Sequence, residues 1–291
     1  MKKILITGAG SFIGMSFERY IRENYSEQYA VDTVDMIDGS WRQISFHGYD
    51  TVYHVAGIAH SDSGKIPPEK EMLYRSVNTD LTVETAKKAK DEGVRQFIFM
   101  SSAIIYGESA PIGEEKIITK NTPPSPANCY GDSKLQAELQ ILPMADSYFK
   151  VVILRPPMIY GKGSKGNFPI LEKFAQKLPV FPLVQNSRSM LYIGNLTEFV
   201  RLMIENEEEG IFWPCNNEPS ETSRLVETIA EVNGRKIKLI GGLTWVLKVL
   251  AHFTGLINKA FGNFIYEPGM GDYKVDYRRF SLKESIEETE K

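Results

Sequence analysis

The sequence has few of the residues that build disulfide-bonded or metal-binding proteins. Its 291 residues include only two cysteines, Cys129 and Cys215, and four histidines. Two cysteines cannot form a disulfide framework, and the histidines show no metal-ligand spacing with them. We therefore expect a protein of a reducing compartment, the cytoplasm, with no metal site.

A strong charge of one sign and a long apolar run are also missing. The net charge of −3 provides no basic field for nucleic acid. The opening "MKKILITGAG" is too short for a signal-peptide core. The most apolar stretch, 243–257, is interrupted by Lys248 and His252 and falls short of the ~20 residues of a membrane span. We expect no nucleic-acid partner and no membrane insertion; 243–257 is predicted as an amphipathic core or interface helix, with membrane-surface attachment as the less favoured alternative.

Short apolar strands alternate with helical patterns through the first half of the chain. "KKILITG", "YAVDTVDM", "DTVYHVAG", "RQFIFMSS" and "KVVILRP" are typical of strands, and "FIGMSFERYIREN" is typical of a helix. This alternation predicts an α/β fold with a doubly wound parallel sheet of the Rossmann type. The alternation of strands and helices ends near residue 158, so we predict a first domain over 1–157. A smaller interleaved C-terminal lobe follows over 158–291, with segments that return to the first domain and a ligand cleft between the two.

A glycine-rich loop joins the first strand to the first helix. "ILITGAGSFIG" places Gly8, Gly10 and Gly14 where a backbone must turn tightly and approach a pyrophosphate. The second strand ends at Asp35, whose carboxylate suits the ribose hydroxyls and disfavours a 2′-phosphate. NAD is the predicted cofactor, and the nearby Arg42 keeps NADP as the alternative.

The segment "SPANCYGDSKLQAEL", 125–139, predicts another helix. Ser125 is the expected N-cap with Pro126 in the first turn. Its expected apolar positions are Leu135, Leu139 and Leu142.

Tyr130 and Lys134 share a face of this helix because they are four residues apart. A neighbouring ammonium favours phenolate, so the pair is a candidate for acid–base chemistry near neutral pH. With 14 tyrosines in the chain the spacing also arises by chance, and its weight depends on the residues around it. Gly131 lies between the two, either where a ligand approaches the backbone or where the helix packs closely.

These motifs occur together in a known order. "TGAGSFIG", "DTVYHVAG", "VNTDLT", "FIFMSSAIIYG", "YGDSK" and "VILRPPMIYG" resemble the extended short-chain dehydrogenase/reductases, the NAD-dependent epimerase/dehydratase family of nucleotide-sugar enzymes. The resemblance extends over the whole chain. It implies a dinucleotide-binding domain over 1–157 and a substrate lobe over 158–291.

The resemblance also implies roles for individual residues. The family's catalytic residues correspond to Ser102, Tyr130 and Lys134. Expected cofactor contacts, besides Tyr130 and Lys134, are Gly8, Gly10, Ser11, Phe12, Ile13, Gly14, Asp35, Val55, Ala56, Gly57 and Asn78. Expected substrate contacts, besides Ser102, are Asn167 and Arg188. Ser11 replaces a family glycine, and the short 35–49 segment predicts a reduced third strand and helix.

The implied activity is oxidation or reduction at C4 of a nucleoside-diphosphate sugar. Ala103 and Ile104 follow Ser102 where family dehydratases carry Asp-Glu, so no 4,6-dehydratase activity is expected. A 4-epimerase of the UDP-glucose/UDP-galactose type is favoured narrowly. The alternative is an NAD(P)H-dependent reductase of a 4-keto sugar in surface-polysaccharide synthesis, which Pro157-Met158 favours. A non-catalytic dinucleotide-binding protein is a remote third alternative. A homodimer is possible.

Overall fold

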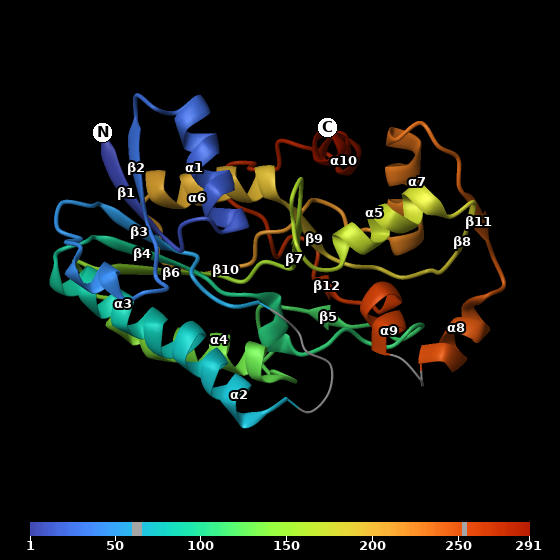
Figure 1. Cartoon of the computed structure of the whole chain (residues 1–291), viewed down its shortest axis with the longest axis horizontal. Coiled ribbons are helices and arrows are strands. Elements are labelled where there is room, and N and C mark those ends of the chain that lie inside the picture. Colours follow the sequence, from blue (N-terminus) through green and yellow to red (C-terminus); the bar gives the residue numbers. More distant parts are fainter. Residues whose placement is uncertain (60–65, 252–254) are drawn as a thin grey trace. The chain divides into compact units, whose positions relative to one another are not determined.

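The computed structural model describes residues 1–59, 66–251 and 255–291, which divide into two compact units (Figure 1). The first unit comprises Met1–Gly107, Pro124–Pro156 and Leu196–Pro214. The second comprises Glu108–Pro123, Pro157–Asn195 and Cys215–Lys291. Each unit is therefore assembled from three separate stretches of the chain.

A parallel sheet forms the centre of the first unit. Its order is β10-β6-β4-β3-β1-β2, and every neighbouring pair is parallel. The strands are β1 (Lys2–Thr7), β2 (Tyr29–Val34), β3 (Thr51–His54), β4 (Gln96–Met100), β6 (Lys150–Leu154) and β10 (Gly210–Phe212). All residues of β3 and β4 are buried, as expected for central strands covered on both faces. The predicted fold class is confirmed.

Helices cover both faces of this sheet (Figure 1). α1 (Phe12–Asn24) and α6 (Ile193–Glu205) lie on one face, and α3 (Leu81–Asp91) and α4 (Cys129–Ile141) lie on the other. α2 (Pro68–Tyr74) continues through a π-helical turn, η2 (Arg75–Asp80), into α3. Large side chains such as Trp41, Phe97 and Phe149 fill the core beneath α3 and α4.

The chain reverses its direction across the sheet between β1 and β3. It passes from β1 to the edge strand β2 and returns to pair β3 on the other side of β1. Residues 35–50 contain one short 3-10 helix, η1 (Ser40–Gln43), and no strand, so the predicted shortening is confirmed. Since the chain departs in opposite directions after β1 and β3, their carboxyl ends border the crevice where ligands bind in such sheets.

The second unit is built from small strand pairs and helices. Its pairs are β5 (Ile117–Ile118) with β12 (Ile265–Tyr266), β7 (Met158–Tyr160) with β9 (Met190–Tyr192), and β8 (Val180–Pro182) with β11 (Lys238–Ile240). Its helices are α5 (Phe168–Lys177), α7 (Thr222–Val232), α8 (Thr244–Ala251), α9 (Gly255–Phe261) and α10 (Leu282–Glu290). Phe181 packs against Phe174 and Phe261, with ring centroids 6.0 and 5.7 Å away.

The apolar stretch 243–257, predicted as a core or interface helix, is not a core helix, and the interface alternative stays a prediction. It contributes α8 and the start of α9, and residues 252–254 lie outside the described residues. Every residue of α8 is described, and none is buried. Among the helices of the described chain, none is long and apolar enough to cross a membrane.

Candidate active site

The glycine loop between β1 and α1 has the geometry that a pyrophosphate requires. Gly8 has φ +96°, and a Cβ there would lie 2.9 Å from the backbone of Ala56. The loops after β1 and β3 therefore approach as closely as glycine permits. A Cβ at Gly10 would meet nothing within 4 Å, so this part of the loop is open. The residues fit a dinucleotide phosphate.

Ser11 ends this loop by capping α1. Its Oγ accepts a hydrogen bond from the Gly14 amide at 3.1 Å. Phe12 and Ile13 open the helix and are partly buried. The hydroxyl of Ser11 is thus hydrogen-bonded to the N-terminus of α1, which explains why serine can replace the family glycine.

Asp35 follows β2 directly and is exposed. Its Oδ1 accepts from the Ile37 amide at 2.9 Å, which orients the carboxylate at the strand end. Arg42, the residue that kept NADP open, donates through Nη2 to Glu84 at 2.6 Å and stacks on Trp41. The structure therefore pairs this arginine with a carboxylate of α3.

The helix that carries Tyr130 begins later than the sequence predicted. Its N-cap is Asn128, whose Oδ1 accepts from the Gly131 amide at 2.9 Å. The Ser125 amide instead donates to the Ile105 carbonyl at 2.8 Å, which ties that residue to the loop after β4. The Ser125 N-cap prediction is wrong because this tertiary hydrogen bond keeps Ser125 outside the helix.

The apolar positions expected for α4 are also corrected. Leu139 and Leu142 are 58% and 37% exposed, so they do not form its packed face. The residues of α4 that are buried are Gly131, Ser133, Lys134, Ala137, Glu138 and Ile141.

A Cβ at Gly131 would lie 2.9 Å from the Ile104 carbonyl oxygen and 3.1 Å from Pro126. Gly131 permits close packing of the helix against protein, so the close-packing alternative holds.

Ser102 and Tyr130 lie in hydrogen-bonding contact. Ser102 caps the 3-10 helix η3 (Ala103–Tyr106) after β4, and its Oγ accepts from the Ile104 amide at 3.3 Å. Burial raises the pKa of Tyr130, and the hydrogen bond with Ser102 acts in the lowering direction. The lowered pKa expected from the Tyr130–Lys134 spacing is therefore not found in this structure.

Lys134 is almost completely buried, with 5% of its surface exposed. Its Nζ donates to the Met100 carbonyl at 2.9 Å and lies 4.7 Å from the centre of the Phe99 ring. Burial lowers the pKa of Lys134 to about 8. The ammonium is thus held at the carboxyl end of β4.

Asn78, on the π-helical turn η2, connects the elements of this region. Its Oδ1 accepts from the Ile58 amide at 2.9 Å, and its Nδ2 donates to Ser133 at 3.0 Å. A Cβ at Gly57 would lie 3.0 Å from Asn78 and 3.1 Å from Lys134 Nζ. The segment after β3 is Val55, Ala56 and Gly57, and its Gly57 therefore lies beside Lys134.

A buried ion pair supports α4, and the sequence reading missed it. Arg155 donates through Nη2 to Glu138 at 2.6 Å and through Nη1 to the Tyr106 hydroxyl at 2.7 Å. Ser101, the neighbour of Ser102, also donates to Glu138. No local pattern signals this pair, because Arg155 lies 17 residues after Glu138, directly after β6.

The two expected substrate contacts lie in the second unit. Asn167 precedes α5 and is exposed. Arg188 donates through Nη1 to the Lys259 carbonyl at 2.6 Å, and burial lowers its pKa while Glu108 acts in the raising direction. The remaining expected residues are in the first unit.

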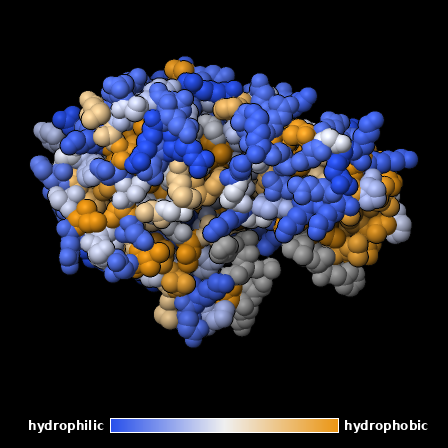
Figure 2. All heavy atoms as spheres, turned by 45° about the horizontal axis from the view of Figure 1, so that its top comes forward, coloured by the Kyte–Doolittle hydropathy of each residue, from blue (hydrophilic) through white to orange (hydrophobic). Residues whose placement is uncertain are grey.

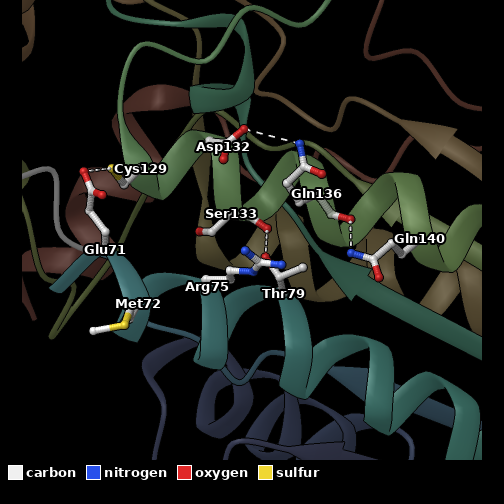
Figure 3. Close-up of a pocket in the computed structure, with 9 residues that line it drawn as sticks. All are labelled: Glu71, Met72, Arg75, Thr79, Cys129, Asp132, Ser133, Gln136 and Gln140. Atoms are coloured by element: carbon white, nitrogen blue, oxygen red, sulfur yellow. Dashed lines mark hydrogen bonds between the residues drawn. The ribbon is translucent and has the colours of Figure 1, made fainter. Parts of the chain in front are cut away.

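A groove of about 400 Å³ lies between α2–η2 and α4 (Figure 3). Its lining residues are Glu71, Met72, Arg75, Thr79, Cys129, Asp132, Ser133, Gln136 and Gln140. None of the residues predicted for catalysis or for cofactor binding lines it. Among the described residues, no group of three or more metal-ligating side chains is found.

Comparison with known proteins adds an independent line of evidence. The sequence model described as the NAD dependent epimerase/dehydratase family matches residues 4–212. A UDP-glucose 4-epimerase of Vibrio cholerae is 32% identical over 90% of this chain and 83% of that protein. An N-acetyl-alpha-D-glucosaminyl-diphospho-ditrans,octacis-undecaprenol 4-epimerase of Escherichia coli O157:H7 is 32% identical over 56% of this chain and 48% of that protein.

Solved structures agree in fold. The dTDP-4-dehydrorhamnose reductase of Bacillus anthracis in complex with NADP has a TM-score of 0.74 at 17% identity, covering 100% of this chain and 99% of that one. The UDP-glucuronic acid 4-epimerase of Bacillus cereus in complex with NAD has a TM-score of 0.74 at 18% identity, covering 99% and 95%. The glycine loop, the arrangement around Tyr130 and Lys134, and these matches agree, and the chain belongs to the NAD-dependent epimerase/dehydratase family.

Proposed function

We propose that this chain interconverts the C4 epimers of a nucleoside-diphosphate sugar, with NAD as its cofactor. The observation that carries the proposal is the contact between Ser102 and Tyr130, with Lys134 one turn further along the same helix. The Vibrio cholerae relative, a UDP-glucose 4-epimerase, supports the reaction type.

The cofactor would bind across the carboxyl ends of β1 and β3. The loop at Gly8 and Gly10 and the N-terminus of α1 would hold the pyrophosphate, and Asp35 would accept from the ribose hydroxyls. Because Arg42 is paired with Glu84, it adds little support for a 2′-phosphate, and NAD is preferred over NADP. When bound, the nicotinamide accepts and returns hydride.

Tyr130 would move the proton that accompanies this hydride. Oxidation at C4 breaks the C4–H and O4–H bonds, and the phenolate oxygen of Tyr130 takes the proton as the carbonyl forms. Ser102 would hydrogen-bond O4 and keep it in reach. Because burial raises the pKa of Tyr130 in this structure, the cation of Lys134 would have to favour the phenolate when cofactor and substrate are bound.

Substrate binding would use residues of the second unit. Arg188 is a buried guanidinium whose fork geometry suits a diphosphate, and a phosphate anion would compensate its desolvation. Asn167, in the glycine-rich loop before α5, would donate to the same group. A 4-epimerase must also let the 4-keto intermediate turn over so that hydride returns to its other face.

A 4-keto-sugar reductase is the second candidate. Pro157-Met158 stands where many relatives have Phe-Asn, which removes an expected substrate contact and fits a smaller pocket. Such an enzyme needs one face of the sugar and consumes NAD(P)H stoichiometrically.

A homodimer in the cytoplasm is part of the proposal. Met72, which lines the groove of Figure 3, and Leu139 of α4 are 63% and 58% exposed, and would be covered by a second copy. Sedimentation velocity on the purified chain tests this; a monomer at micromolar concentration contradicts it.

Stoichiometry is the deciding experiment. The purified chain is incubated with a panel of UDP-, dTDP- and GDP-sugars, with and without NADH or NADPH. Interconversion of a C4 pair such as UDP-glucose and UDP-galactose without added reductant supports the epimerase. Equimolar NAD(P)H oxidation on a 4-keto sugar, with no interconversion of any pair, establishes the reductase instead.

A further inference from the structure

The helix α8 presents an apolar surface to solvent. Trp245, Val249 and Leu250 are 69%, 53% and 45% exposed. At about 100° per residue these side chains, with Val246, fall within an arc of about 140° on one side of the helix. Large apolar side chains gathered in this way mark an interaction site rather than scattered surface positions.

Outside the apolar arc, α8 contacts another segment of the second unit. Lys248 lies about 60° beyond Trp245, outside the apolar arc. A Cβ built on Gly113 would lie 2.8 Å from Lys248 Nζ, so this side chain reaches the turn before β5. Lys248 therefore contacts this turn from a position outside the apolar arc.

Hydrophobic side chains are also visible around this helix. Figure 2 shows them gathered at the right-hand end, the end at which Figure 1 places α8 and β11. Ile240 of β11 and Val180 of β8 are 37% and 43% exposed, and Val180 pairs in register with Lys238. Exposed apolar side chains are thus found both on α8 and on the strand pair β8 and β11 that precedes it.

The segment that carries this surface contains basic residues and no acidic ones. Residues 232–266 contain no Asp or Glu, although the chain has 37 such residues in total. The basic residues of the same stretch are Arg235, Lys236, Lys238, Lys248 and Lys259. Arg235, Lys236 and Lys238 are exposed. The segment that carries α8 is therefore positively charged in a chain with a net charge of −3, although the exposed Glu114 and Glu115 follow Gly113, the residue that Lys248 reaches.

We propose that α8 and the basic segment before it dock this protein on the surface of an anionic lipid bilayer. An exposed apolar arc with a tryptophan, bordered by lysines and too short to span, is the pattern of a helix that lies in the interface. A second copy is disfavoured as the occupant because it would place lysines against lysines. A nucleic acid would satisfy the lysines but not the apolar arc.

Vesicle flotation with the full chain tests the proposal. Vesicles of phosphatidylglycerol and phosphatidylcholine should carry the protein, whereas phosphatidylcholine alone should carry much less. The tryptophan fluorescence should shift to shorter wavelength on binding, and Trp245→Ser should abolish this shift, because Trp41 is fully buried and Trp213 is partly buried with its Nε1 donating to the Tyr106 hydroxyl at 2.8 Å. Raising the salt should weaken the binding through screening.

Variants separate the two contributions. Trp245→Ser/Val249→Ser should lower the affinity for anionic vesicles at least about tenfold. Lys236→Glu/Lys238→Glu should lower it about fivefold or more per residue. The matched control is Tyr148→Ser, which removes an aromatic side chain that is 86% exposed in the first unit and should leave binding unchanged.

Three results would overturn the proposal. The first is no flotation with anionic vesicles, and the second is flotation that the α8 variants do not reduce. The third is self-association that requires Trp245 and Val249 without any vesicle binding, which would make a second copy the occupant. Circular dichroism melting should show that the variants stay folded, because the changed side chains are exposed in this structure.

Discussion

The helices α4 and α8 reverse the usual relation between polarity and burial. α4 buries a lysine and a glutamate, Lys134 and Glu138, while its Leu139 is 58% exposed. α8 consists almost entirely of apolar residues, and none of them is buried.

The reason lies in the partners that each helix meets. In α4, the Met100 carbonyl compensates the Lys134 ammonium, and Arg155 compensates the Glu138 carboxylate. A buried charge is tolerated when such partners are in place. In α8, none of the residues of the apolar arc is buried. Burial is therefore decided by the surface that the fold places opposite a helix and not by the composition of the helix itself.

The largest expected effect comes from breaking the buried pair of α4. Glu138→Ala should lower the free energy of unfolding by about 3–5 kcal/mol, because Arg155 stays buried without its counter-charge. The neighbouring Leu139→Ala is the matched control and should change stability by only about 0.5 kcal/mol. Urea denaturation of both variants measures the difference. Equal effects at the two positions would contradict the account of α4 given above.

Removing the buried lysine should change how stability depends on pH. Burial lowers the pKa of Lys134 from 10.5 to about 8, so the unfolded chain binds this proton more tightly than the folded one. The cost to stability is fully present below pH 8 and is relieved as the pH rises from 8 to 10.5. A shift of this size corresponds to at most roughly 3 kcal/mol.

The free energy of unfolding of Lys134→Met should therefore lack this rise between pH 8 and pH 10.5. Its free energy of unfolding at pH 7 should stay close to that of the wild type or exceed it, while catalysis is lost. Denaturation curves of both proteins at pH 7 and pH 9.5 give the comparison. Parallel changes with pH in wild type and variant would show that Lys134 is not the group responsible.

Tyr130 tests whether the polar face of α4 acts in the reaction. Tyr130→Phe keeps the ring but removes the transferable proton, so turnover should fall at least about 10²-fold, the lower end for positioned acid–base catalysis. Cofactor affinity, measured by titration calorimetry, should be largely retained. Tyr148→Phe removes the hydroxyl of an exposed tyrosine and serves as the control. Near-normal turnover of Tyr130→Phe would remove this residue from the mechanism.

The smallest effect is expected in α8. Trp245→Ser replaces a large apolar side chain, yet that side chain is 69% exposed, so stability should change by only about 0.5 kcal/mol. Thermal melting measures this. A loss of several kcal/mol would mean that Trp245 packs within the protein, and the contrast with α4 would fail.

The sequence by itself determined the elements whose signals are local. The strands β1, β2, β3, β4 and β6 and the helix over Phe12–Asn24 follow from short-range periodicity, and the shortened connection after Asp35 follows from length; the edge strand β10 was not predicted. The need for glycine at position 8 is local in part, because the turn has φ +96° there, and the close approach of Ala56 adds a tertiary reason. The predictions of Ser102, Tyr130 and Lys134 came from motif order, and the structure places them in one region of the first unit.

Only the tertiary structure decided which surfaces those elements would cover. Asn128 became the N-cap because Ser125 is bonded to Ile105, and Gly131 is required because Ile104 packs against it. The support of α4 by Arg155 and the exposure of α8 depend on groups distant in sequence. Hydrogen bonds, ion pairs and close packing between such groups exist only once the chain has folded, and a pattern along the chain carries no record of them.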